Sequence, residues 1–109
     1  MLFAKENPVR SEKYRRAVAA LECAHCGVWG RSQAAHPPPT GKGIKESDLE
    51  CVPLCSVWPS GLEGCHILAD TYRIKPKGEL RPWMLELAKE TRAKIFAAGM
   101  WPRGLELYD

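Results

Sequence analysis

The stretch that decides the fold is CAHCG at residues 23–27, a Cys-x-x-Cys-Gly turn. Two cysteines at this spacing present both thiolates from one tight loop, which is the geometry of half a structural zinc site. Further along the chain, Cys55 and Cys65 can supply the other two thiolates. The sequence therefore predicts a zinc site formed by Cys23, Cys26, Cys55 and Cys65.

Cys51 is a competing ligand in this site. Nine residues separate Cys55 from Cys65, which is wider than the usual spacing of a zinc-binding pair. Cys51 lies four residues before Cys55, and on a strand both side chains would point to the same face. A cysteine without a metal or disulfide is usually a small buried hydrophobic residue, and we favour that interpretation for Cys51.

Length and charge limit the class of protein. A chain of 109 residues is one domain near the small end of what a single core can stabilise, so a bound metal would add useful stability. The net charge of +3 favours an anionic partner only weakly. No segment has the apolar stretch of a secretory signal or of a membrane helix. We therefore expect a cytoplasmic protein without a membrane partner, whose cysteines bind metal and form no disulfides.

The apolar periodicity predicts one α+β domain over residues 1–109. Ser11 is the expected N-cap of an N-terminal helix over 12–22. Two strands over 32–36 and 49–54 follow the zinc knuckle, separated by a loop with three consecutive prolines. A short helix over 65–72 comes next, and Pro82 suits the first turn of a C-terminal helix over 82–98. The tail after residue 99 either packs back on the domain or contacts a partner.

Three polar side chains form a second group of candidates. His36 ends the first predicted strand, and an imidazole can act as a general base near neutral pH. His66 and Asp70 are four residues apart on the short helix, so they share a face. An imidazole and a carboxylate together can hold a divalent cation with open coordination positions, as metal-assisted hydrolysis requires. The alternatives are a partly buried structural His36 and an Asp70 that is merely solvated.

Four lysines are candidate contacts to nucleic acid. Lys42 and Lys45 lie on the glycine-containing loop after His36, and Lys75 and Lys77 follow the short helix. Both pairs flank the proposed site in the sequence, so they are expected to contact backbone phosphates. The alternative is that they are ordinary solvated surface lysines.

The order of these motifs resembles the HNH endonuclease superfamily. The segments AAH at 34–36, GKGIKESDLECVPLC at 41–55 and GCH at 64–66 are more narrowly similar to small phage and prophage HNH nucleases linked to recombination. The resemblance covers residues 23–70. It implies a small ββα-metal (His-Me finger) core with a structural zinc over residues 23–73, flanked by the N- and C-terminal helices.

The resemblance also implies a role for each matching residue. His36 corresponds to the general base, Asp48 to the residue, usually asparagine, that steadies the loop, His66 to a metal ligand, and Asp70 to a second ligand found in some members. The implied activity is metal-dependent hydrolysis of DNA phosphodiester bonds with magnesium, manganese or zinc. DNA is the implied partner, recombination proteins are candidate further partners, and a phage-encoded enzyme would act in the host cytoplasm.

The sequence departs from this family at two places. Many members have an acidic residue or a histidine just before the base, where this chain has Ala35, and the insertion between Cys55 and Cys65 is unusual. Either Asp70 compensates, or His36 is itself a ligand, or activity has been lost. A non-catalytic zinc-stapled DNA-binding module and a zinc-containing protein-interaction domain therefore remain alternatives. The sequence predicts neither the oligomeric state nor a preferred DNA sequence.

Overall fold

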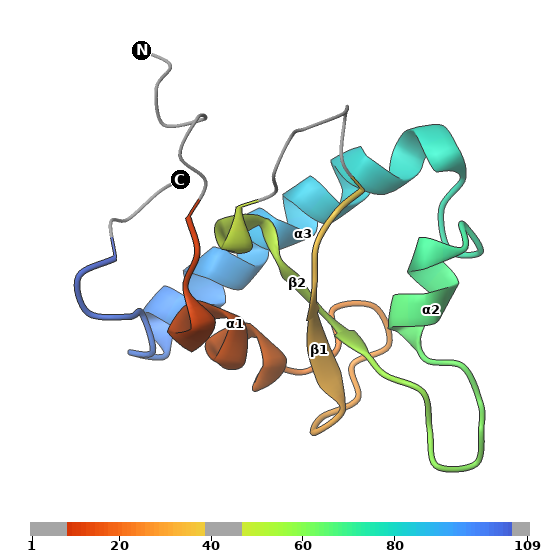
Figure 1. Cartoon of the computed structure of the whole chain (residues 1–109), viewed down its shortest axis with the longest axis horizontal. Helices are drawn as coiled ribbons and strands as arrows, with labels where there is room; N and C mark the ends of the chain where they lie inside the picture. The colour runs from red at the N-terminus through yellow and green to blue at the C-terminus, as the bar shows by residue number, and fades with distance from the viewer. Residues whose placement is uncertain (1–8, 39–46, 106–109) are drawn as a thin grey trace.

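The structure, a computed structural model, describes residues 9–38 and 47–105, so Lys42 and Lys45 lie outside the described residues. The described residues form a two-stranded sheet, three α-helices and a short 3-10 helix (Figure 1). In chain order the elements are α1 (Glu12–Ala19), β1 (Ser32–Ala35), η2 (Asp48–Glu50), β2 (Val52–Cys55), α2 (Cys65–Asp70) and α3 (Lys77–Ala97). The predicted small α+β class is confirmed for this part of the chain.

Helix α1 begins where the sequence predicts and ends earlier. The Ser11 hydroxyl accepts a hydrogen bond from the backbone N–H of Tyr14, which is the expected N-cap. The predicted end at residue 22 was wrong, because the chain leaves the helix after Ala19 and turns through Leu21 toward the Cys-x-x-Cys-Gly knuckle. This early end allows Cys23 to join the turn at residues 23–27.

Strands β1 and β2 pair in antiparallel fashion, with Ser32 opposite Cys55 and Ala35 opposite Val52. The predicted second strand, 49–54, was wrong at its start. Residues 48–50 form η2, where the Ser47 hydroxyl accepts a hydrogen bond from the Leu49 amide, so extended backbone begins only at β2. The first strand ends at Ala35, and His36 therefore follows directly after the paired residues.

The two C-terminal helices also differ from their predicted limits. The predicted helix 65–72 ends at Asp70, because Tyr72 has a positive φ of 58°. The predicted helix 82–98 was wrong at its start, since α3 begins at Lys77 with Pro76 as its N-cap residue. Pro82 lies inside the helix and lacks the N–H that would bond to the carbonyl of Gly78. The loss of one hydrogen bond near the helix start does not end the helix.

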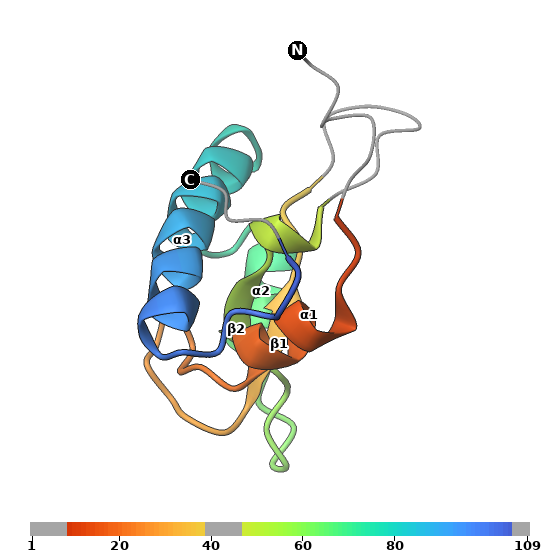
Figure 2. The same ribbon diagram turned by 90° about the vertical axis from the view of Figure 1, so that its left-hand side faces the viewer.

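The core consists of two apolar clusters on either side of the strands. Figure 2 shows α3 on one side of the strands and α1 on the other. One cluster joins the strands to α2 and the first half of α3, and the other joins α1, η2 and the end of α3. Trp101 packs edge-on against Tyr14, so the described part of the tail folds back on the domain. Among the described residues, no helix is both long enough and apolar enough to cross a membrane.

Candidate functional site

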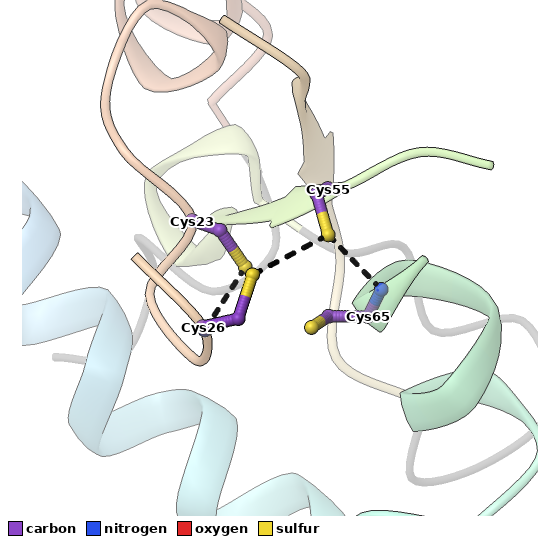
Figure 3. A group of neighbouring side chains, drawn as sticks. All are labelled: Cys23, Cys26, Cys55 and Cys65. Carbon is purple, nitrogen blue, oxygen red and sulfur yellow. Dashed lines mark hydrogen bonds between the residues drawn. The ribbon is translucent and has the colours of Figure 1, made fainter. Parts of the chain in front are cut away.

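Four cysteine thiols converge at one end of the sheet. Cys23 and Cys26 come from the knuckle, Cys55 ends β2, and Cys65 begins α2 (Figure 3). All four sulfur atoms lie within 4.8 Å of one another, and Cys26 Sγ is 3.8 Å from Cys55 Sγ. Four thiolates bound to one zinc ion at about 2.3 Å would place neighbouring sulfurs about 3.8 Å apart. The donor set therefore fits a structural metal such as zinc.

The local backbone explains how these four thiols meet. The knuckle closes through hydrogen bonds from the Gly27 amide to the Cys23 carbonyl and from the Cys23 amide to the Val28 carbonyl. The positive φ of 82° at Gly27 suits a residue without a Cβ atom. At the other end of the cluster, the Cys65 amide lies 3.2 Å from Cys55 Sγ and orients α2 toward β2. Backbone amides directed at sulfur are partners that favour the thiolate form.

The thiol pKa values differ across the cluster. Burial alone would raise the pKa of Cys23, but backbone hydrogen bonds from Cys26, His25 and Cys55 lower it to about 7. Burial raises the pKa of Cys26, and burial together with the neighbouring thiols raises the pKa of Cys65. A bound cation would reverse these increases, because thiols that coordinate a metal are deprotonated.

Cys51 does not belong to this cluster. Its thiol is fully buried and lies with His36 and Asp48, where the three ligand atoms are also within 4.8 Å of one another. Burial raises the pKa of Cys51 to about 12, and the negative charge of Asp48 adds to this effect. Because its thiol is fully buried and lies apart from the four-cysteine group, Cys51 is better described as a buried apolar residue beside His36.

Asp48 is a buried carboxylate whose partners come from several elements. Its side chain is 1% exposed, and its Oδ2 accepts hydrogen bonds from the Ser11 amide, at 2.7 Å, and from the Arg15 guanidinium. The Arg10 guanidinium lies 3.6 Å from Oδ1. Burial opposes ionisation, yet the hydrogen bonds of Ser11, His36 and Arg15 hold the pKa of Asp48 below its usual value of 3.8. Asp48 is therefore ionised at neutral pH.

The Asp48 carboxylate orients the His36 ring. His36 Nε2 is 3.0 Å from Asp48 Oδ1, and Cys51 Sγ lies 3.3 Å from the same nitrogen. An ionised carboxylate can only accept, so Nε2 carries the proton and Nδ1 keeps its lone pair in the neutral ring. Among the described residues, Nδ1 has no hydrogen-bond partner. This tautomer has the form that a general base needs.

His66 is oriented in a complementary way. Its Nδ1 is 2.8 Å from Oε1 of Gln33 on β1, so Nδ1 donates and Nε2 keeps the lone pair of the neutral ring. Nε2 lies 3.5 Å from Asp70 Oδ2, one helical turn away. A lone pair facing a carboxylate oxygen is favourable when a proton or a cation lies between them. The described residues supply no third histidine, cysteine or carboxylate that forms a metal-binding group with this pair.

One open pocket is lined by a residue from each of these two groups, His36 and Asp70. It has a volume of about 480 Å³ and is lined by residues from four segments of the chain: Arg10, His36, Pro37, Pro38, Asp70, Tyr72 and Leu80. His36 and Asp70 therefore border the same space, while the cysteine cluster lies outside this lining. Lys75 is half-buried on the connection between α2 and α3, and Lys77 is exposed as the first residue of α3, both close in sequence to Tyr72.

Several members of the site are not among the residues predicted from the sequence. Arg10 and Arg15 neutralise Asp48, Gln33 orients His66, and Tyr72 lines the pocket. The Gln33 contact is one that a sequence pattern can predict. Alternate side chains of a strand point to the same face of the sheet, so they can contact a helix that packs on that face. The arginines carry no such signal, because Arg10 precedes α1, Arg15 lies on α1, and both meet Asp48 only through the tertiary fold.

Comparison with known proteins gives no match, whether against protein-family models, curated proteins or solved structures.

Proposed function

We propose that this protein is a metal-dependent nuclease that hydrolyses DNA phosphodiester bonds. The observation that carries the proposal is the pocket that is lined by both the Asp48-oriented His36 and Asp70. A base with a free lone pair and a carboxylate beside a second imidazole are the groups that metal-assisted hydrolysis uses. The antiparallel strands followed by a helix carrying His66 also accord with the HNH resemblance and its ββα-metal core.

In this proposal His36 is the general base. Its Nδ1 takes the proton from the attacking water, while Asp48 accepts the hydrogen bond from Nε2–H and stabilises the imidazolium that forms. The hydrogen bonds from Ser11, His36 and Arg15 hold the pKa of Asp48 low, so the carboxylate does not itself take the proton. Asp48 is thus a positioning residue.

His66 and Asp70 are the proposed ligands of the divalent cation. Gln33 fixes the His66 ring so that Nε2 points toward Asp70, as an outer partner of a metal-binding histidine does. A divalent cation bound there would stabilise negative charge on the scissile phosphate and on the leaving oxygen. Two protein ligands leave coordination positions for phosphate and water, which magnesium and manganese accept readily.

DNA is the proposed substrate because several basic residues either line this pocket or lie close in the sequence to residues that line it. Arg10 lines it, Lys75 and Lys77 follow Tyr72, and Lys42 and Lys45 belong to the segment after His36. Such residues contact phosphates without reading sequence, so we expect sequence-tolerant binding that weakens as salt rises.

A non-catalytic zinc-stapled DNA-binding module is the second candidate. One observation favours it: among the described residues, the proposed catalytic cation has only His66 and Asp70 as ligands. Ala35, which precedes His36, offers no ligand atom. Binding of DNA without cleavage would identify this module.

Cleavage of supercoiled plasmid by zinc-loaded protein tests the proposal. With added magnesium, manganese or zinc, we expect the parent to nick or linearise the plasmid. His36→Ala should cut at least ~100-fold more slowly, because it lacks the general base. His66→Ala should require a higher concentration of the added metal. The rates are measured from single-turnover time courses on agarose gels.

His25→Ala is the matched control for this experiment. His25 is an exposed histidine on the knuckle, edge-on to Trp83 and absent from the pocket lining, so its removal should leave cleavage within ~2-fold of the parent. Equal rates for His36→Ala and the parent would remove His36 as the base. No cleavage by the parent with any of the three metals would favour the binding module.

A further inference from the structure

Tyr72 has a backbone conformation that normally belongs to glycine. It follows α2 with a φ of 58°, and it is the one residue other than glycine with a positive φ in the described part of the chain. The Tyr72 amide bonds to the Ala69 carbonyl at 3.0 Å, and the Arg73 amide bonds to the Leu68 carbonyl at 2.8 Å. These two bonds form a Schellman motif, with Tyr72 at the position where glycine is preferred. The tyrosine Cβ atom makes this conformation less favourable than it would be for glycine.

Packing within the described fold does not account for a tyrosine at this position. The residue is 41% exposed and belongs to neither core cluster. Among the described residues, no hydrogen bond involves its hydroxyl. Strained residues of this kind cluster at functional sites, where the side chain has a role other than stabilising the fold.

The position of Tyr72 indicates what that purpose is. The residue lines the same pocket as His36 and Asp70. Much of the remaining lining is apolar, from Pro37, Pro38 and Leu80, and Arg10 is the cationic residue in it. Duplex backbone would need several cations on these walls, whereas a flat nucleobase fits between an aromatic ring and proline rings. A volume of about 480 Å³ falls in the range of pockets that enclose a small ligand.

We propose that Tyr72 stacks on an unpaired nucleobase of the strand whose phosphate reaches His36. The substrate class is then single-stranded DNA, or DNA with a locally unpaired nucleotide at the cleaved position. The inference rests on the proposed nuclease function, because it takes His36 as the group that meets the phosphate. The Tyr72 ring acts through stacking, so its hydroxyl is dispensable.

Binding and thermal unfolding of the full chain, both without added divalent metal, test this inference. The probes are a fluorescent 15-nucleotide single strand of mixed sequence and the matched duplex. We expect Tyr72→Gly to melt at the same temperature as the parent or higher, because glycine relieves the strain. The same variant should bind the single strand roughly 5- to 100-fold more weakly, the range for the loss of one stacked base.

Tyr72→Phe is the matched control, because it keeps the ring and removes the hydroxyl. It should bind the single strand within ~2-fold of the parent, and the duplex affinity should change little in either variant. A Tyr72→Gly protein that melts well below the parent would show a structural role and overturn the inference. Parent-like binding of the single strand by Tyr72→Gly would overturn it as well.

The plasmid assay separates this inference from the nuclease proposal. If the parent cuts DNA but Tyr72→Gly binds and cuts single strands like the parent, the stacking inference fails and the nuclease stands. If the parent binds single strands through Tyr72 but cuts no DNA with any divalent metal, the nuclease fails and Tyr72 remains a base-stacking residue.

Discussion

At the residue scale, Asp48 is the charge on which the site depends. Two arginines, a backbone amide and His36 surround one buried carboxylate, so its negative charge is compensated from α1, from the segment before it and from the end of β1. Removing one partner of a buried ion pair leaves an uncompensated buried charge. The free-energy cost of that charge is far larger than the stabilisation that the intact pair provides. The same carboxylate fixes the His36 tautomer, so stability and proposed chemistry share one side chain.

Asp48→Asn should lower the free energy of unfolding at pH 7 by about 3 kcal/mol, the scale of a broken buried pair. The folded-state pKa of Asp48 is lowered, so its stabilising contribution is complete above the unfolded value near 3.8 and is lost as pH falls through the folded value. The difference between parent and variant should therefore be constant from pH 5 to 8 and shrink below about pH 4. Urea unfolding at several pH values measures it.

Glu86→Gln is the control for Asp48→Asn, because it removes one carboxylate charge from an exposed pair with Lys89 on α3. This substitution should change stability by less than about 1 kcal/mol at any of these pH values. A loss in Asp48→Asn no larger than in Glu86→Gln would contradict the role assigned to Asp48.

At the element scale, the connection from β2 to α2 sets the position of Cys65. The loop over 56–64 closes on itself through bonds between Trp58 and Leu62 and from the Gly61 amide to the Trp58 carbonyl. Gly64 then passes so close to β2 that a Cβ atom would lie 2.1 Å from the Ser56 carbonyl oxygen and 2.4 Å from that of Cys55. The ten-residue separation of the two cysteines is therefore compatible with one metal site, because the loop brings its ends together.

Gly64→Ala should move α2 away from β2, since backbone atoms cannot yield as a flexible side chain does. We expect a loss of stability of about 2–4 kcal/mol and weaker zinc binding, because the Cys65 ligand moves with the helix. Gly78→Ala, in the first turn of α3 with open space around it, should instead be neutral or stabilise by up to about 0.5 kcal/mol. Equal zinc affinities for Gly64→Ala and the parent, in a competition titration with a chelator, would contradict this account.

These elements also show what the sequence predicts well. The Ser11 cap and the cysteine spacing depend on local chemistry, so the start of α1 and the convergence of the four cysteines were predicted correctly. The predicted start of α3 was wrong because proline suits a first helical turn but is also tolerated a little further along, and Pro82 lies inside the helix. The Asp48 network and the strained Tyr72 depend on tertiary contacts between distant segments, which no local pattern encodes.

At the scale of the whole molecule, the cysteine cluster connects three parts of the chain that also meet in one of the two apolar clusters. The knuckle follows α1, Cys55 ends β2, and Cys65 begins the helix that carries His66 and Asp70. The core itself is divided into two clusters. A metal bound by the four thiols would therefore hold α2 against the sheet and keep Asp70 at the pocket that His36 borders.

The zinc content of the purified protein tests this architecture directly. We expect about one tightly bound zinc per chain, with most of the fold lost in Cys23→Ser and after treatment with a strong chelator. Cys51→Ala is the matched control, because it removes a buried cysteine that lies outside the cluster. This variant should keep its zinc and lose only about 1 kcal/mol of stability. Elemental analysis and thermal unfolding measure both quantities. A metal-free parent that unfolds cooperatively, or a Cys51→Ala protein that loses zinc as Cys23→Ser does, would contradict the four-cysteine assignment.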